Sequence, residues 1–177
     1  QTARALSDRI GESVAGAAEI SLDRGSGQIK VHRFWTAVNP GIVVNPDVVV
    51  AQCESNVIFG LGQALRERNT FVDGAIVQSN FHDYEVMRMS DMPEIAVTVI
   101  STPDRPTGIG EIVLPVVAPA VASAIFALTG KRIRTLPLKT DARWPNFEVR
   151  GEVILTRKAF ERLNDERDSE GLPRFAN

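Results

Sequence analysis

One long stretch without a charged side chain limits most strongly how this chain can fold. It runs from Ile112 to Thr129 and consists almost entirely of apolar and small residues. Such a segment exposes apolar surface on every side, so it has to be buried against other parts of a protein. We predict a helix over residues 114–129. Gly130 is placed to end it, because glycine accepts the left-handed conformation that follows many helices.

Glu111 stands directly before this stretch, after the turn Gly108-Ile109-Gly110. Glycines allow backbone angles and close approaches that a Cβ would prevent. No other charge follows until past Thr129, so we expect Glu111 to be buried and rigidly held. Burial moves the pKa of a carboxylate towards neutral pH, which suits a general base. The alternative is a carboxylate that only interacts favourably with the positive end of the helix dipole.

The upstream residues predict hairpins and one more helix. Asn45 is a typical N-cap, with Pro46 at the first helical position, and the helix is expected to run to about Arg68. Its small residues either pack closely against a backbone or ligand or simply weaken a core helix. The fold class is α+β, with two main helices and mixed hairpins. The expected strands are 13–23 and 28–38, a hairpin over 70–79 around Asp73-Gly74, and single strands at 94–100, 132–138 and 147–155.

Composition excludes several classes of function. The 177 residues can form one domain with a core, and a net charge of −2 offers no basic field for nucleic acid. No signal peptide is visible, and no apolar run is long enough to span a bilayer. The single Cys53 excludes an intrachain disulfide and an all-cysteine metal site, and His32 and His82 are far apart. We therefore expect no metal ligands from this chain; a metal would arrive inside an organic cofactor or be held by another chain.

Several segments, taken in order, resemble a known family. These are residues 45–65, Asn80-Phe-His-Asp-Tyr84, Gly108-Ile-Gly-Glu111, residues 118–130 and Lys131-Arg-Ile-Arg-Thr-Leu-Pro137. They are similar to the C-terminal part of the molybdenum-binding subunit of the xanthine oxidase family, within the bacterial isoquinoline 1-oxidoreductase and aldehyde dehydrogenase type. The resemblance covers roughly residues 11–138. It divides the chain into residues 1–138, part of a molybdopterin-binding domain that is incomplete without a partner, and residues 139–177. This extension either wraps a partner or is a surface appendage, and we find no chemistry in it.

The resemblance implies roles for two residues. Glu111 corresponds to the general base beside molybdenum, and Gln52 to an amide that hydrogen-bonds the molybdopterin. We also expect Gly110 to contact the cofactor, because glycine allows a close approach. From its own chemistry, Gln52 could instead be a buried helix amide satisfied by the backbone. The chain departs from the family pattern after Gln52, where Ser55-Asn56 replaces two glycines.

The resemblance also implies cofactors and partners. It implies a molybdenum–molybdopterin, in the cytosine dinucleotide form, shared with the remainder of the molybdenum-binding subunit. Iron–sulfur clusters would lie on a [2Fe–2S] subunit, and haem on a cytochrome c subunit. The expected substrate is an aldehyde or an N-heteroaromatic compound. The expected location is the periplasm or the periplasmic side of the inner membrane, with the cytoplasm as the alternative. A non-catalytic structural or assembly subunit is the alternative function.

Overall fold

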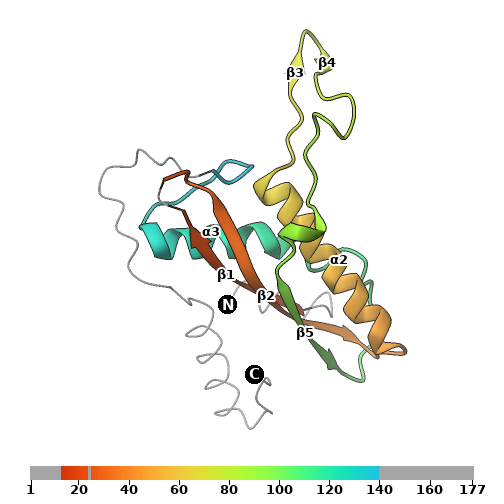
Figure 1. The fold of residues 1–177 in the computed structure, drawn as a ribbon. Coiled ribbons are helices and arrows are strands. Elements are labelled where there is room, and N and C mark those ends of the chain that lie inside the picture. The colour runs from red at the N-terminus through yellow and green to blue at the C-terminus, as the bar shows by residue number, and fades with distance from the viewer. Residues whose placement is uncertain (1–12, 24, 140–177) are drawn as a thin grey trace.

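The computed structural model describes residues 13–23 and 25–139 (Figure 1). Two helices pack with a small mixed sheet, and a narrow arm projects from this body. The strand expected at residues 147–155 lies outside the described residues. The described elements are β1 (Ser13–Leu22), β2 (Ile29–Gly41), α2 (Pro46–Leu65), β3 (Phe71–Val72), β4 (Ala75–Ile76), the 3-10 turn η1 (Met89–Asp91), β5 (Glu94–Ser101) and α3 (Leu114–Thr129).

The main sheet has the strand order β1-β2-β5. β1 and β2 form the predicted antiparallel hairpin, with Gly16 opposite Thr36 and a register shift after Glu19. β5 lies where a strand was predicted and pairs with β2 in parallel, placing Ala96 opposite Trp35. Parallel neighbours need a crossover connection, and α2 is part of it. The carboxyl ends of β2 and β5 therefore lie at the same edge of the sheet.

Both helices begin where they were predicted to begin; α3 also ends as predicted, whereas α2 ends at Leu65, before the predicted Arg68. The Asn45 side chain accepts a hydrogen bond from the Val48 N–H at 3.3 Å, which confirms the predicted N-cap of α2. α3 starts at Leu114 and ends at Gly130, whose φ of 69° is the left-handed conformation predicted for it. α3 packs on β1 and on α2, and α2 also contacts β5.

The core lies between the sheet and the two helices. Its largest fully buried side chains include Phe34 of β2, Leu61 of α2 and Ile125 of α3. The helices approach closely at Gly60, where a Cβ would lie only 2.7 Å from Cβ of Val117. The small residues of α2 thus include one that helix packing requires.

Residues 69–88, called the arm from here on, project from the end of α2 (Figure 1). β3 and β4 pair across Asp73 and Gly74, whose φ angles of 50° and 80° are both positive. Positive φ at both central positions is characteristic of the tight turn of a two-residue hairpin, as the Asp-Gly pair predicted. At its base, Arg66 forms ion pairs with Glu85 and Asp91.

Two predictions from the sequence are wrong, one about residues 132–138 and one about a membrane-spanning helix. Residues 132–138 form no strand; the segment passes the C-terminal end of α2, where the Leu138 N–H donates to the Ala64 carbonyl at 2.6 Å and the Leu138 side chain is buried. Pro137, which has no N–H, cannot serve as a donor in a strand ladder.

By length and composition, the helix Pro46–Leu65 is apolar enough to cross a membrane, contrary to our expectation. In this structure it is a core helix, buried along one face by α3 and the sheet.

Candidate functional site

The loop that carries Glu111 is fixed at the carboxyl edge of the parallel strand pair. It leaves β5 after Ser101, and the Thr107 N–H donates to the Pro40 carbonyl at 3.0 Å. The Ile42 N–H donates to the Asp104 carbonyl at 3.1 Å. Gly41 has a φ of 79°, and a Cβ there would lie 2.8 Å from the Asp104 carbonyl oxygen. The loop therefore lies directly on the end of β2, a position where open α/β sheets commonly bind ligands.

The far end of the loop is held by Asn56, a residue of α2. Its side-chain nitrogen donates to the Gly110 carbonyl at 2.7 Å and to the Gln52 carbonyl at 2.6 Å. Its side-chain oxygen accepts from the Leu114 N–H at 3.2 Å. Asn56 is only 3% exposed and, with Thr36, is one of the two buried polar residues in the described part of the chain. One amide thus connects three backbone segments.

Glu111 is exposed, which corrects the expectation that it is buried. Ile112 packs partly against the core and Val113 is fully buried, so the carboxylate between these residues and Gly110 is left at the surface. Glu111 also lies three residues before α3 rather than in its first turn, and its own carbonyl accepts from the Leu114 N–H at 3.2 Å. The prediction of a rigidly held position agrees with the tethers at Thr107 and Gly110.

The structure brings the three predicted site residues together. The carbonyl oxygens of Gln52 and Gly110 both lie within 2.7 Å of the same nitrogen of Asn56, and Glu111 follows Gly110 directly. Gln52 is exposed on α2, so the alternative of a buried helix amide is wrong. These residues form an open edge between α2 and the loop.

The glycines beside Glu111 are not explained by the packing of the described residues. Neither Gly108 nor Gly110 has a positive φ, and a Cβ at either position would meet nothing within 4 Å. Between them, Ile109 packs against the core. The glycines thus leave free space on the outer side of a well-anchored turn. A planar organic cofactor could approach the backbone there, and Gln52 carries an exposed side-chain amide that can donate and accept hydrogen bonds.

The other chemically reactive side chains do not join this edge. Cys53 is buried, and burial raises the pKa of its thiol to about 11, with a smaller contribution from the charge of Glu54. His32 contacts the Ser21 hydroxyl at 2.7 Å, and His82 lies 3.6 Å from Asp83. Both histidines are exposed, and each lies against a polar side chain. Among residues 13–23 and 25–139, no group of three His, Cys, Asp or Glu side chains is placed to hold a metal ion.

A hollow of about 690 Å³ lies elsewhere on the molecule. It is found between the β1–β2 turn and the base of the arm, and its lining includes Ser21, Arg66 and Asp91. Glu111, Gln52 and Gly110 do not line it. The candidate site is therefore an exposed edge that a second body could cover, rather than a pocket closed by the described residues.

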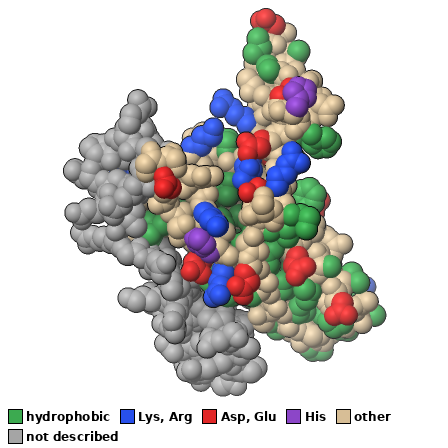
Figure 2. Space-filling model, viewed as in Figure 1, with side chains coloured by type: hydrophobic (Ala, Val, Ile, Leu, Met, Phe, Trp, Pro, Cys, Tyr) green, Lys and Arg blue, Asp and Glu red, His purple; other side chains and the backbone are tan. Residues whose placement is uncertain are grey.

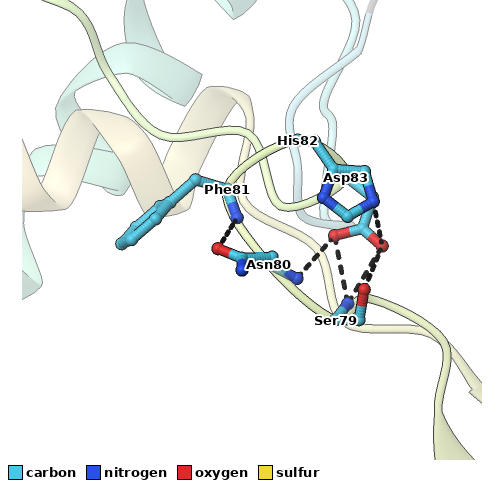
Figure 3. Close-up of polar contacts among 5 residues, drawn as sticks. All are labelled: Ser79, Asn80, Phe81, His82 and Asp83. Carbon is cyan, nitrogen blue, oxygen red and sulfur yellow. Dashed lines mark hydrogen bonds and ion pairs between the residues drawn. The ribbon is translucent and has the colours of Figure 1, made fainter.

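The arm exposes apolar side chains, and hydrogen bonds to the Asp83 carboxylate hold part of its backbone in place. The N–H groups of Ser79 and Asn80 donate to the Asp83 carboxylate at 2.9–3.0 Å, and these bonds lower the pKa of Asp83 (Figure 3). Phe81 points away from this cluster. Figure 2 shows hydrophobic side chains gathered on the arm and along α2. The exposed ones on the arm are Phe71, Val72, Ile76, Val77 and Phe81, each more than half exposed.

Comparison with known proteins supports a shared ancestry for this fold. Residues 11–93 match the model of the molybdopterin cofactor-binding domain. A 126-residue stretch is 39% identical to the beta chain of isoquinoline 1-oxidoreductase from Brevundimonas diminuta. The chain is homologous to molybdenum-binding subunits of the xanthine oxidase family. The resemblance stated from sequence is confirmed.

The chain covers only a small part of these relatives. The Brevundimonas match takes in 71% of this chain and 16% of the relative. A subunit of nicotinate dehydrogenase from Pseudomonas putida is 30% identical over 72% of this chain and 11% of its own length. The aldehyde oxidoreductase molybdenum-binding subunit PaoC of Escherichia coli is 30% identical over 70% of this chain and 18% of its own length. These relatives are molybdenum-dependent oxidoreductases that belong to multi-chain complexes.

Solved structures agree on the fold. Quinoline 2-oxidoreductase from Pseudomonas putida 86 superposes with a TM-score of 0.64 at 26% identity, over 69% of this chain and 17% of that one. Aldehyde oxidoreductase from Desulfovibrio gigas superposes with a TM-score of 0.63 at 22% identity, over 71% of this chain and 14% of that one. The mixed sheet and two helices are therefore a portion of a molybdenum hydroxylase subunit fold.

A second likeness concerns the end of the chain and was missed by sequence reasoning. Residues 127–177 match the NAD-dependent DNA ligase adenylation domain. A DNA ligase of Solibacter usitatus is 57% identical over 47 residues, which are 27% of this chain and 7% of that ligase. From the sequence, we had set residues 139–177 apart only as an extension in which we found no chemistry. The two family matches do not overlap, since the first ends at residue 93.

Proposed function

We propose that this chain supplies the general base and one edge of the cofactor site of a molybdenum hydroxylase that oxidises an aldehyde or an N-heteroaromatic compound. The observation that carries the proposal is the Asn56 bridge, which holds the turn before Glu111 against the backbone of Gln52. A carboxylate, an amide and a free backbone edge are thereby concentrated in one small region. The homology supports a molybdenum–molybdopterin as the cofactor.

Each residue of this edge has a defined task. Gln52 would hydrogen-bond the edge of the pterin, since an amide donates and accepts at once. Gly108 and Gly110 would let the cofactor approach the backbone. When bound, molybdenum supplies Lewis-acid activation of a water-derived oxygen and accepts two electrons. Glu111 would accept a proton at its carboxylate during the reaction, which requires it to be ionised beforehand.

The exposure of Glu111 fits a shared site. Much of the related subunits has no counterpart in this chain, which spans about 16% of the Brevundimonas protein. We infer that the remainder of the molybdenum-binding subunit covers Glu111, Gln52 and the glycines and so excludes water from them. The arm is a suitable docking element, because its paired turns hold Phe71 and Phe81 exposed. Apolar side chains presented together in this way are typical of protein interfaces.

The finer points of the proposal concern the assembly. We propose the cytosine dinucleotide form of the cofactor, a [2Fe–2S] subunit that takes electrons onward, and a cytochrome c subunit after it. The periplasm, or the periplasmic side of the inner membrane, is the proposed location. The resemblance to the bacterial isoquinoline and aldehyde oxidising type supports these points.

Replacement of Glu111 by Gln in the assembled protein tests the function. We expect molybdenum content and subunit composition near wild type but turnover per bound molybdenum lower by about 10²–10⁴-fold, since Gln keeps the size of the side chain and cannot take the proton. Glu94→Gln is the matched control. Glu94 is an exposed carboxylate paired with Arg33 at the start of β5, and its loss should leave turnover unchanged.

The measurement is steady-state oxidation of an aldehyde and of an N-heterocycle, normalised to molybdenum. Normal turnover of Glu111→Gln would overturn the catalytic role. The structural or assembly subunit would then be the better description of this chain.

A further inference from the structure

We infer that Asn56 is a positioning residue, whose side-chain amide sets the place of Glu111 relative to Gln52. The inference rests on the proposed function and names a residue to which neither the family resemblance nor the chemistry of the site had given a role. It acts on Glu111 through the backbone of Gly110 and Leu114, without touching the carboxylate.

The hydrogen bonds of Asn56 use both donor positions of its amide and one acceptor position. Both donor positions of the nitrogen are directed to carbonyls, those of Gln52 and Gly110, and the oxygen accepts from the Leu114 N–H. Its side chain is buried, so water does not compete for these bonds. Aspartate has the same shape but no donor, and serine has one hydroxyl where two donors are used. Asparagine alone among residues of this size can make all three bonds.

The turn needs this tether because its own sequence gives it little support. α3 has no N-cap side chain, since Val113 occupies the cap position. Asn56 supplies a side-chain cap from a different helix, by accepting from the first N–H of α3, which it shares with the Glu111 carbonyl. Gly108 and Gly110 add backbone freedom on the other side of Glu111. Without Asn56, the loop before Glu111 keeps the hydrogen bonds of Thr107 to Pro40 and of Ile42 to Asp104, which lie further from the carboxylate along the chain.

The geometry makes Glu111 sensitive to this tether. A general base must lie within hydrogen-bond reach of the proton that it removes, and a displacement of about 1 Å can cost about 10²-fold in rate. Gln52 belongs to α2 and keeps its place when the turn moves. Loss of Asn56 should therefore impair turnover more than it impairs cofactor binding.

The test compares Asn56→Asp and the milder Asn56→Ser with Thr36→Val in the chain assembled with the remainder of its subunit. Thr36 is the matched control, because it is equally buried and its hydroxyl donates to the Ala15 carbonyl in the sheet. Three quantities are measured: amide hydrogen exchange over residues 108–116, molybdenum content, and turnover per bound molybdenum.

For both Asn56 variants we expect faster exchange over residues 108–116, nearly normal molybdenum content, and a fall of about 10²-fold in kcat with little change in KM. Thr36→Val should lower the thermal midpoint and leave exchange in this segment and turnover per molybdenum unchanged. If the Asn56 variants lose stability but keep wild-type exchange or wild-type kcat, the inference is wrong.

Glu111→Gln, assayed beside these variants, separates the two proposals. If it abolishes turnover while Asn56→Ser remains fully active, the proposed function stands and the positioning role fails. If Glu111→Gln is fully active, the proposed function fails, and the positioning role fails with it.

Discussion

At the scale of single residues, the exposure of Glu111 shapes how it can act. Its side chain is open to solvent, so the described residues of this chain do not exclude water from the carboxylate. To act as a general base, Glu111 would need other chains to shield it from water and this chain to hold it in an accurate position. The second condition is met by the bonds of Asn56 and Thr107.

Gln52 gives a prediction that separates binding from chemistry. Gln52→Leu removes the amide while keeping a similar side-chain volume, and the exposed position on α2 should tolerate the change. Loss of one hydrogen bond to a bound polar group costs about 1–3 kcal/mol, so molybdenum content should fall while turnover per bound molybdenum stays close to wild type. Metal analysis of the purified assembly measures this. Unchanged content and turnover would show that the amide does not contact the cofactor.

Cys53 gives a prediction for the dependence of stability on pH. Burial raises the pKa of the thiol from its ordinary value of 9.0 to about 11, so the folded chain holds the proton more tightly than the unfolded chain. Between these two values the unfolded chain binds fewer protons, and the free energy of unfolding falls as pH rises. Below pH 9 the thiol has no such effect. Urea unfolding at pH 8 and pH 10 should therefore show a smaller decline for Cys53→Ala than for wild type; equal declines would contradict the assignment.

The residue scale also shows what sequence could and could not predict. Glu111, Gln52 and Gly110 were found because each lies in a recognisable segment, and the structure brings them together. Asn56 was noted only as a departure from two glycines. Its partners are a residue four positions away and two residues more than fifty positions away, and distant contacts of this kind leave no local pattern. The one available signal was the missing N-cap before Leu114.

At the scale of elements, capping and turn residues predicted most helix and hairpin boundaries, but the sequence did not predict that β5 pairs with β2. Asn45-Pro46, Asp73-Gly74 and Gly130 act through neighbouring backbone, so their effects could be predicted from a few residues. The parallel pairing of β5 with β2 depends on how α2 folds back, which is a property of the whole chain. The predicted strand at 132–138 failed for the same reason, because Leu138 is buried against α2 instead of pairing in a sheet.

The contact between α2 and α3 gives a prediction with a built-in contrast. Gly60→Ala would place a Cβ 2.7 Å from Cβ of Val117, whereas Gly108→Ala meets nothing within 4 Å. We expect Gly60→Ala to lower the free energy of unfolding by about 1–3 kcal/mol through overpacking. Alanine favours helix over glycine by about 1 kcal/mol, so the net loss of stability is up to about 2 kcal/mol.

Gly108→Ala should change stability by less than about 0.5 kcal/mol and should lower molybdenum content, because its Cβ fills space left for the cofactor. Urea unfolding and metal analysis of both variants test this contrast. If Gly108→Ala is destabilised and Gly60→Ala is not, helix packing does not require Gly60, and the space at Gly108 is not free.

At the scale of the whole molecule, the described body continues past the start of the ligase-like region. The ligase match begins at residue 127, yet residues 127–129 are the last turn of α3. Ile133 packs partly against the core, and Leu138 is only 4% exposed. The described residues up to Lys139 thus belong physically to the molybdenum hydroxylase fold, although their sequence is also compatible with the other family.

This boundary predicts the effects of two truncations. A chain ending at Lys139 retains every described contact, so it should assemble with the remainder of the subunit and show wild-type molybdenum content and turnover. A chain ending at Lys131 loses the burial of Ile133 and Leu138 and should be less stable by about 2–5 kcal/mol, the usual cost of removing a large core side chain.

Co-purification of the partner and thermal unfolding of the assembly measure both effects. Leu138→Ala in the full chain is the control, since it removes the same buried side chain without shortening the protein. If the chain ending at Lys139 fails to assemble, residues 140–177 contribute to the hydroxylase fold, and the ligase likeness does not mark a separate unit.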